Sequence, residues 1–326
     1  MHILVTGAAG MVGRKFVERI ARDGHLGERA VTQMTLHDVV PPIAPTGSII
    51  FKTSTSDFAA PGEAANLVAE RPDVIIHLAA VVSGEAESDF DKGYHVNFDG
   101  TYALFQAIRA IGDHYRPRVV FSSSIAVFGA PFPEAIDDEF FSTPLTSYGT
   151  QKAMCELLLA DYSRRGIFDG IGIRLPTICV RPGKPNKAAS GFFSNIIREP
   201  LAGQEAVLPV PTSVRHWAAS PRAAVGFILH AATIDSARVG PRRNLTMPGV
   251  DITVGSEIEA LRKVAGEKAV KLIRHEIDPT IAAIVDGWPR TFQAKRAHEL
   301  GFTADKDFEA IVHAHIEDEL AGKIAL

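Results

Sequence analysis

Tyr148 is the one tyrosine of this chain that has a lysine four residues further along, Lys152, in the segment TSYGTQKAMCE. Side chains four residues apart lie on the same face of a helix. An ammonium group in that position lowers the pKa of the phenol, so that the phenolate can accept a hydroxyl proton near neutral pH. Taken alone, the pair is also consistent with a surface tyrosine beside an unrelated lysine.

Three consecutive serines, Ser122, Ser123 and Ser124, stand in the segment FSSSIAVFG, directly after an apolar run. Ligand-binding residues of doubly wound sheets lie just beyond the carboxyl ends of the strands. A hydroxyl group there can hydrogen-bond the same oxygen atom that Tyr148 deprotonates. A strand-to-loop turn is the alternative explanation for two of the three serines.

Glycines recur with the spacing G-x-x-G-x-x-G in TGAAGMVG, at Gly7, Gly10 and Gly13. The pattern follows an apolar run and opens a helix near Met11. Gly7 permits a tight turn, Gly10 lets the backbone approach a pyrophosphate, and Gly13 allows the helix to pack closely on the strand. Backbone N–H groups from Gly10 to Gly13, including that of Val12, then hold the anion. We therefore expect a dinucleotide here, against the alternative of a glycine-rich turn without a ligand.

Asp38 ends the second apolar run, 25 residues after Gly13. An acidic residue at this place accepts hydrogen bonds from the adenosine ribose. The next residues are Val39, Val40 and Pro41, so no arginine or lysine is present to receive a 2′-phosphate. This favours NAD over NADP, although an aspartate can also cap a turn.

Short apolar runs alternate with amphipathic segments over the first 180 residues, as in a parallel sheet with helical crossovers. The expected strands are 2–6, 34–37, 49–52, 74–79, 118–122 and 171–175, and the expected helices between them are 13–23, 62–71, 94–111 and 147–164. The fold class expected is therefore α/β, a doubly wound parallel (Rossmann) sheet with a smaller C-terminal substrate lobe.

The character of the sequence changes beyond residue 180, where prolines become frequent. We expect residues 1–180 to form an NAD-binding domain to which residues 212–234 return. The smaller lobe, expected to bind the substrate, comprises residues 181–211 and 235–326. Helices are expected at 191–201, 220–233, 254–264 and 307–318.

The composition is that of an ordinary globular protein, with 326 residues, 46% of them hydrophobic, and a net charge of −4. A weakly acidic protein is not expected to bind nucleic acid or anionic membranes, because such binding needs an excess of positive charge. No signal peptide or membrane span is expected. Only two cysteines occur, Cys155 and Cys179, so the protein is expected in the reducing cytoplasm. His313 and His315 have no acidic or thiol partner at ligand spacing, and no metal is expected.

These motifs together resemble the extended short-chain dehydrogenase/reductase superfamily. The resemblance rests on the glycine pattern, HLAA at residues 77–80, Asn97, FSSSIAVFG, the Tyr148–Lys152 pair and AKRAHELGF near the C-terminus. It implies that Ser124, Tyr148 and Lys152 form a catalytic triad and that the cofactor is NAD. The expected cofactor contacts are Gly7, Gly10, Met11, Val12, Gly13, Asp38, Ser54, Leu78, Ala79, Ala80, Asn97, Ser122, Tyr148, Lys152, Pro176 and Ile178.

Departures from the family pattern narrow the expected chemistry. Phe128 stands where most members have tyrosine, Ser54 where an aspartate commonly touches adenine, and Thr177 where asparagine is usual. Sugar-nucleotide 4,6-dehydratases place an Asp-Glu pair after the catalytic hydroxyl residue, whereas this chain has Ile125 and Ala126. The resemblance therefore argues against a dehydratase of that kind.

The segment beginning at Arg215, RHWAASPR, keeps the arginine and an aromatic residue of the epimerase nucleotide stretch and lacks its acids. The segments VVSGEAE, RLPTICVRPGKPN, IIREPLAGQEA and GWP instead resemble a subgroup that oxidises sugar acids. The resemblance implies NAD-dependent oxidation of the C2 hydroxyl of a small aldonic acid. The expected substrate is D-erythronate, and the expected product is 2-oxo-tetronate. The alternatives are a nucleoside-diphosphate-sugar epimerase with tightly held NAD and a non-catalytic NAD-sensing protein.

An acid substrate needs a fixed cation, and Arg215, Lys184 and Arg181 lie in the loops where this fold binds substrate. Ser83 is expected to meet polyol hydroxyls, with a helix N-cap as the alternative. The full set of expected substrate contacts is Ser83, Ser124, Tyr148, Lys184 and Arg215. Helices 94–111 and 147–164 carry apolar residues on more than one face, which predicts a homodimer.

Overall fold

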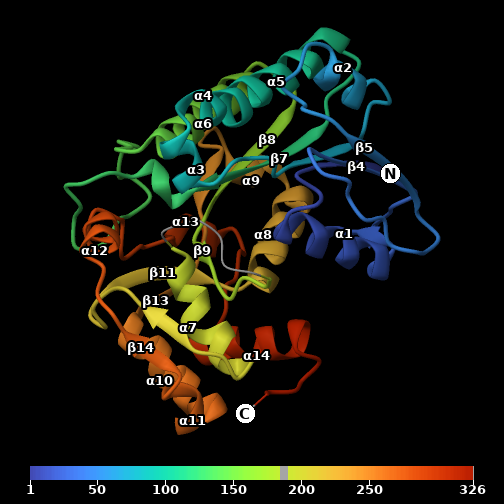
Figure 1. Cartoon of the computed structure of the whole chain (residues 1–326). Coiled ribbons are helices and arrows are strands. Elements are labelled where there is room, and N and C mark those ends of the chain that lie inside the picture. The colour runs from blue at the N-terminus through green and yellow to red at the C-terminus, as the bar shows by residue number, and fades with distance from the viewer. Residues whose placement is uncertain (184–189, 326) are drawn as a thin grey trace. The chain divides into compact units, whose positions relative to one another are not determined.

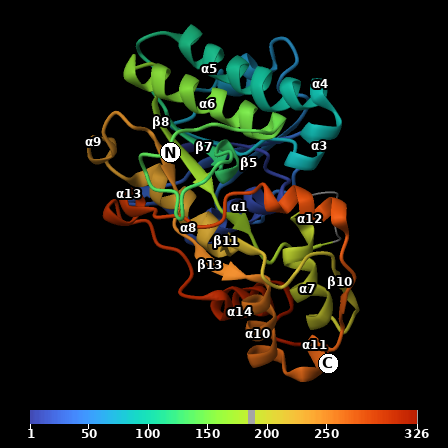
Figure 2. The same ribbon diagram turned by 90° about the vertical axis from the view of Figure 1, so that its left-hand side faces the viewer.

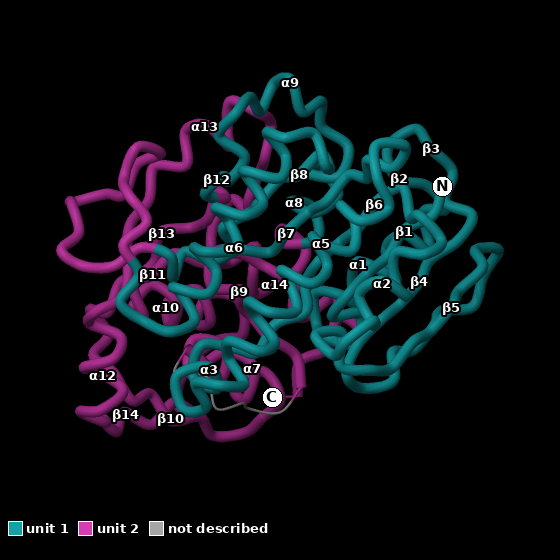
Figure 3. The backbone as a smooth tube through the Cα atoms, turned by 90° about the horizontal axis from the view of Figure 1, so that it is seen from above, with its two compact units in different colours: residues 1–127, 144–175, 225–246 teal, residues 128–143, 176–224, 247–326 magenta. Residues whose placement is uncertain are grey.

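The computed structural model describes residues 1–183 and 190–325, and this part of the chain forms two compact units (Figure 3). Unit 1 comprises residues 1–127, 144–175 and 225–246, and unit 2 comprises residues 128–143, 176–224 and 247–326. The division differs from the expected one, because the stretch that returns to the first unit is 225–246 rather than 212–234. Residues 128–143, expected in the NAD-binding domain, belong to unit 2.

Unit 1 is built on a seven-stranded parallel sheet with the order β12-β8-β7-β6-β1-β4-β5, which confirms the expected fold class. Its strands are β1 (His2–Thr6), β4 (Gln33–Asp38), β5 (Ile50–Thr55), β6 (Val74–His77), β7 (Arg118–Ser124), β8 (Asp169–Leu175) and β12 (Asn244–Thr246). The six strands expected from apolar runs are present. The seventh, β12, was not predicted, because its three residues, NLT, form no apolar run.

Helices cover both faces of this sheet, with α5 and α6 on one side and α1 and α8 on the other (Figure 1). The helices are α1 (Met11–Asp23), α2 (Glu63–Val68), α3 (Ser83–Ser88), α4 (Phe90–Gly93), α5 (Gly100–Ile111), α6 (Ser147–Arg164), α8 (Pro221–Thr233) and α9 (Ser236–Val239). A short antiparallel pair, β2 (His25–Leu26) and β3 (Arg29–Ala30), follows α1. The expected helix 147–164 is confirmed at both ends, whereas the expected helix 94–111 begins with a π-helical segment, Tyr94–Asp99, before α5.

The core beneath α5 and α6 is apolar and aromatic. Phe105 of α5 packs against Phe168, with ring centroids 4.8 Å apart, and both rings also contact Tyr162 of α6. Val119 of β7 belongs to the same cluster of buried residues. Burying these large side chains is what holds the two helices on the sheet.

Unit 2 contains a three-stranded sheet of order β13-β11-β9 and a separate parallel pair, β10 with β14. Its elements are β9 (Thr177–Ile178), α7 (Gly191–Leu201), β10 (Ala206–Leu208), β11 (Arg215–Ala219), β13 (Val250–Thr253), α10 (Val254–Ala265), α11 (Glu267–Val270), β14 (Ile273–His275), α12 (Pro279–Asp286), α13 (Lys295–Glu299) and α14 (Phe308–Glu319). Helices α7, α10 and α14 bury their apolar faces in one core. No helix within residues 1–183 and 190–325 is long and apolar enough to cross a membrane.

One carboxyl group lies inside the core of unit 2. Glu257 of α10 is fully buried, and neither of its carboxyl oxygens has a hydrogen-bond partner among the described residues. Burial raises the pKa of Glu257 well above its usual range, because the charged form loses its hydration. Glu257 is therefore protonated in the native state and ionises on unfolding, where its pKa is ordinary.

Replacing this carboxyl group should change how stability depends on pH. Because the folded protein holds a proton that the unfolded chain releases, Glu257 costs about 1.4 kcal/mol of stability per pH unit above its unfolded pKa. Glu257→Gln cannot ionise, so the slope of its free energy of unfolding against pH should be more positive than that of the wild type between pH 5 and pH 7, by up to about 1.4 kcal/mol per pH unit. Urea unfolding at several pH values measures both slopes. Glu134→Gln, an exposed change in the same unit, is the control, and parallel slopes for Glu257→Gln and wild type would contradict the assignment.

Candidate active site

Tyr148 and Lys152 lie in the first two turns of α6, whose start is fixed by three contacts. The Thr146 side chain accepts a hydrogen bond from the Gly149 N–H, and Glu87 of α3 accepts one from the Ser147 N–H at 3.0 Å. A Cβ atom on Gly149 would lie 2.1 Å from the Ala126 carbonyl oxygen, so only glycine allows this close approach. Helix α6 therefore starts at a defined position beside the end of β7.

Lys152 is 2% exposed, and its ammonium group donates a hydrogen bond to the carbonyl oxygen of Ser122 at 2.8 Å. The Nζ atom lies 4.8 Å from the centre of the Phe121 ring and 5.8 Å from the centre of the Tyr148 ring. Burial lowers the pKa of Lys152 to about 8, since the charged form loses hydration. Lys152 thus stays protonated at neutral pH and favours negative charge on the nearby phenol.

The three serines at the end of β7 have different roles. The Ser122 hydroxyl donates to the His77 carbonyl oxygen, and the Ser123 hydroxyl donates to Glu156 of α6, so both are engaged within the fold. Ser124 is half-buried, and its Oγ accepts a hydrogen bond from the Ala126 N–H at 3.1 Å. Because that bond uses a lone pair, the Ser124 hydroxyl keeps its proton for another acceptor.

An ion pair behind the site was not found from the sequence. Arg174 of β8 donates to both carboxylate oxygens of Glu156, at 2.7 to 3.1 Å, and Glu156 is almost fully buried. Glu156 lies four residues after Lys152, as Lys152 lies four residues after Tyr148, so all three share one face of the helix. This spacing could have identified Glu156 from the sequence. Its partner on another strand has no signal in the local sequence. The pair ties α6 to the sheet directly behind Lys152.

The glycine loop between β1 and α1 forms a tight cradle. A Cβ atom on Gly7, whose φ is +75°, would lie 2.7 Å from the Ala79 nitrogen, and one on Gly13 would lie 2.2 Å from the Gly7 carbonyl oxygen. Helix α1 has Gly10 at its N-cap, no side-chain cap and no acidic residue in its first turn. The first N–H groups of the helix, including those of Met11 and Val12, are thus left to an anion.

Asp38, the last residue of β4, faces this loop. One of its carboxylate oxygens accepts from the Ala9 N–H at 2.9 Å and the other from the Val40 N–H at 3.3 Å. A carboxylate has further lone pairs, which suit the two hydroxyls of a ribose. The cradle and Asp38 together therefore fit a dinucleotide such as NAD, with the pyrophosphate at α1 and the adenosine ribose at Asp38.

Other expected cofactor residues lie around the same sheet edge. Leu78, Ala79 and Ala80 follow β6 directly, and the Leu78 N–H donates to the Thr6 carbonyl oxygen of β1. Asn97, in the π-helical segment, bonds both the N–H and the carbonyl of Val81 and donates to Gln151 of α6 at 2.7 Å. Ser54 lies in β5 opposite His37 of β4. Asn97 therefore positions the backbone that follows β6.

Several expected residues belong to unit 2 or are engaged with other groups. Pro176 and Ile178 belong to unit 2, where Ile178 is in β9. Ser83 is the first residue of α3, whose N-cap is Val82, so the alternative of Ser83 as an N-cap is wrong. Arg215, at the start of β11, is 49% exposed and donates to Asp251 at 2.9 Å. Lys184 lies outside the described residues.

Arg181, the third cation considered for an acid substrate, is engaged within unit 2. Its guanidinium donates to the Ile178 carbonyl oxygen and to the Ser190 hydroxyl. Over the described residues, no group of three or more histidine, cysteine, aspartate or glutamate side chains is arranged to hold a metal ion.

Known proteins match this chain along nearly its whole length. The model of the NAD dependent epimerase/dehydratase family matches residues 3–242. The D-erythronate dehydrogenase of Cupriavidus necator is 42% identical over 322 residues, covering 98% of each chain, and that of Haemophilus influenzae is 40% identical, covering 98% of this chain and 100% of the relative. A solved structure described as the nucleoside-diphosphate-sugar epimerase from Agrobacterium tumefaciens is 67% identical, with a TM-score of 0.97 over 99% of this chain and 95% of that chain.

Removing one charge of the Glu156–Arg174 pair should destabilise the protein more than removing both charges. Glu156→Gln leaves the Arg174 charge without its counter-ion in a nearly buried position, which costs about 3–5 kcal/mol in comparable buried pairs. The double variant Glu156→Gln/Arg174→Met removes both charges and should recover much of that loss. Denaturant unfolding of the two single variants and the double variant gives the coupling energy. Additive effects of the two substitutions would show that the pair does not hold α6 to β8.

Proposed function

The chain belongs to the NAD dependent epimerase/dehydratase family, and we propose that within it the protein oxidises the C2 hydroxyl of a small aldonic acid with NAD. The proposed substrate is D-erythronate, and the product is 2-oxo-tetronate. The observation that carries this proposal is the identity of 42% and 40% to two D-erythronate dehydrogenases over 98% of the chain. The buried Lys152 beneath Tyr148, with Ser124 at the adjoining strand end, supplies groups suited to alcohol oxidation.

Each reacting atom has a partner in the proposed mechanism. Tyr148, as the phenolate, removes the proton of the C2 hydroxyl, and Ser124 donates a hydrogen bond to the same oxygen. Lys152, protonated below a pKa of about 8, stabilises the phenolate form of Tyr148. NAD, when bound, would supply the acceptor for the hydride of C2. Asp38 and the Gly7–Gly13 cradle would hold the cofactor.

A second candidate function is supported by the solved structure that is 67% identical, because that protein is described as a nucleoside-diphosphate-sugar epimerase. An epimerase returns the hydride to its sugar, so it keeps NAD and forms no net NADH. A non-catalytic NAD-sensing protein is a third candidate. Against that third candidate, Ser124, Tyr148 and Lys152 are all present.

Net NADH production distinguishes these candidates. The purified protein should raise the absorbance at 340 nm when it is mixed with NAD and D-erythronate, within a panel of four- to six-carbon aldonic acids. Conversion of a nucleotide sugar without NADH would support the epimerase. No turnover of any acid in the panel would overturn the proposed function.

We further propose that Arg215 holds the substrate carboxylate and that Ser83 meets a substrate hydroxyl. Arg215 uses one donor on Asp251, and its guanidinium has other donors for a planar, bidentate partner. Lys184 is a further proposed contact. Pro176 and Ile178 are proposed to contact the cofactor.

The loss of the Tyr148 hydroxyl should abolish turnover and spare cofactor binding. Tyr148→Phe removes only the proton acceptor, and the loss of a general base typically lowers the rate by ~10²–10⁴-fold. Steady-state kinetics with D-erythronate and calorimetric titration with NAD separate the two effects, and Tyr94→Phe is the matched control. A Tyr148→Phe variant with a tenth of the wild-type rate would exclude Tyr148 as the base. Lys152→Met should reduce both the rate and the affinity for NAD.

Arg215→Met should weaken the binding of the acid substrate and leave the affinity for NAD unchanged. The loss of charge-assisted hydrogen bonds, ~1.5–3 kcal/mol, corresponds to a rise in KM of about 10- to 150-fold. Arg290→Met, which removes another exposed arginine of unit 2, should leave the KM unchanged. If Arg215→Met loses NAD affinity and keeps the KM of the acid, the carboxylate is held elsewhere.

We propose a homodimer in the cytoplasm, with the partner covering α4, α5 and α6. Helices α5 and α6 lie side by side in Figure 2, and α4 leads into α5 through the π-helical segment. These helices expose Phe90 (58%), Tyr102 (42%) and Leu157 (73%), and such apolar surface favours association. Both cysteines, Cys155 and Cys179, are buried free thiols, in keeping with a reducing compartment.

Light scattering at micromolar concentration should give the mass of two chains. Leu157→Glu should shift the protein to the mass of one chain, because a carboxylate would be buried in the interface. Val207→Glu, at an exposed apolar residue of unit 2, is the control. A monomeric wild type would reject the dimer, and recovery in the membrane or periplasmic fraction would reject the cytoplasmic location.

A further inference from the structure

Unit 1 has a hollow at the end of its sheet where strands β1, β6, β7 and β8 begin. Its volume is about 730 Å³. Ser124 lies at the opposite, carboxyl end of β7, and Lys152 donates to the Ser122 carbonyl oxygen near the same end, so the proposed reaction does not use this hollow. The charged side chains that line it include Arg29, Arg71, Arg116, Arg118, Asp73 and Asp169.

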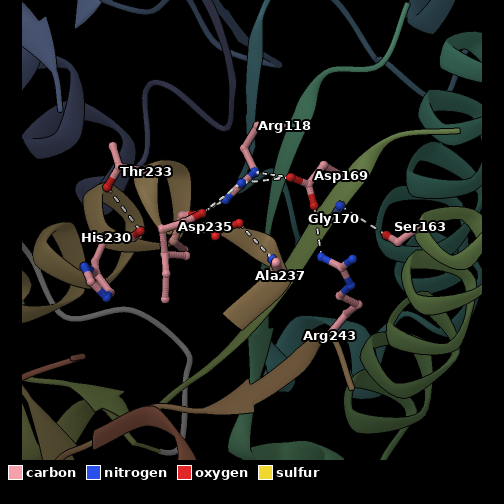
Figure 4. Close-up of polar contacts among 11 residues, drawn as sticks. Arg118, Ser163, Asp169, Gly170, His230, Thr233, Asp235, Ala237 and Arg243 are labelled. Carbon is pink, nitrogen blue, oxygen red and sulfur yellow. Dashed lines mark hydrogen bonds and ion pairs between the residues drawn. The ribbon is translucent and has the colours of Figure 1, made fainter. Parts of the chain in front are cut away.

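Part of this charge is engaged within the fold. Arg118 pairs with Asp169 at 2.8 Å and donates to the carbonyl oxygens of Ala231 and Ile234, at the end of α8, and Asp169 also accepts from Arg243 (Figure 4). Because two arginines share Asp169, this carboxylate is fully compensated and adds no negative field to the hollow.

The second carboxylate, Asp73, is compensated as well. One of its oxygens accepts from Arg29 at 2.8 Å and the other from the His2 N–H. These partners lower the pKa of Asp73 against the opposing effect of burial. The remaining lining carboxylate, Glu28, is exposed.

Arg71 and Arg116 remain, and within residues 1–183 and 190–325 their guanidinium groups make no hydrogen bond or ion pair. Their loops are tied together, because the buried Tyr115 hydroxyl donates to the Pro72 carbonyl oxygen at 2.8 Å. Arg71 directly precedes Pro72, and Arg116 directly follows Tyr115. The two cations are thus held on adjoining loops, and His114 lines the same wall.

The backbone at Arg71 adds an independent observation. Its φ is +52°, in the left-handed region that favours glycine, and it is one of two such residues other than glycine in the described chain. Strained positions of this kind persist where the surrounding structure holds them, and they cluster at functional sites. A basic side chain stands here at a position that glycine would occupy without strain.

We propose that this hollow is a binding site for a compact anion that carries a phosphate group, held by Arg71 and Arg116. Guanidinium groups bind phosphate oxygens through paired, charge-assisted hydrogen bonds. The hollow thus has two uncompensated arginine charges, Arg71 and Arg116, against one exposed carboxylate, Glu28, and the surplus of positive charge favours an anion. The site is separate from the glycine cradle, which would hold the pyrophosphate of the cofactor at the other end of the sheet.

Inorganic pyrophosphate is the probe, titrated calorimetrically at constant ionic strength into protein saturated with NAD, so that the glycine cradle is already filled. The wild type should bind it saturably. Arg116→Gln and Arg71→Asn should each weaken binding by about tenfold or more, since each loses charge-assisted bonds. Asparagine tolerates the left-handed backbone, so the second variant keeps the local fold.

The control is Lys268→Gln/Lys271→Gln, which removes two exposed charges of unit 2 and should bind the probe as the wild type does. NAD affinity and thermal unfolding of every variant report whether the fold is intact. Absence of saturable binding to the wild type would overturn the proposal. Equal affinity of the wild type and the double variant Arg71→Asn/Arg116→Gln would also overturn it.

Discussion

A buried ammonium group needs an acceptor that the fold supplies, and Lys152 meets this requirement at one place on the sheet. Strand β6 ends at His77, which pairs with Phe121 of β7, so Ser122 lies one residue beyond the last pair on that side. Its carbonyl oxygen accepts from Lys152 at 2.8 Å. The staggered ends of β6 and β7 thus create the acceptor, and the acceptor fixes Lys152 beneath Tyr148.

The other contacts of α6 preserve this arrangement. The helix cannot shift along β7, because Gly149 packs against the Ala126 carbonyl and Glu156 binds Arg174 of β8. Asn97 of the neighbouring helical segment donates to Gln151, which is one residue from Lys152. The proposed general base, Tyr148, requires positioning within about half an ångström, and several elements that meet at α6 supply it.

Much of this could be predicted because the signals are local. The glycine spacing, the apolar runs and the Tyr148–Lys152 spacing each depend on residues close together in the sequence. The short strand β12 was missed because its pairing with β8 is tertiary. Arg174 could not be predicted as the partner of Glu156 for the same reason, because that contact is also tertiary. Asp251, which binds Arg215, lies on β13, and no local pattern brings these two residues together.

Two features of the backbone could not be predicted for a different reason. They are the left-handed conformation of Arg71 and the π-helical segment around Asn97. Both are departures from ordinary backbone geometry that packing imposes, and residue type alone carries no sign of them. The fold and the placement of Tyr148 and Lys152 on one helix are therefore accessible from sequence, whereas the contacts that hold side chains in place require the structure.

In the proposed reaction, hydride leaves C2 of D-erythronate while Tyr148 takes the hydroxyl proton. D-erythronate labelled with deuterium at C2 tests this step, with NAD as the oxidant and mass spectrometry of the reduced cofactor. One deuterium per molecule of reduced cofactor and a slower turnover of the labelled acid are expected. Reduced cofactor without deuterium, or the label kept in a rearranged sugar, would contradict it.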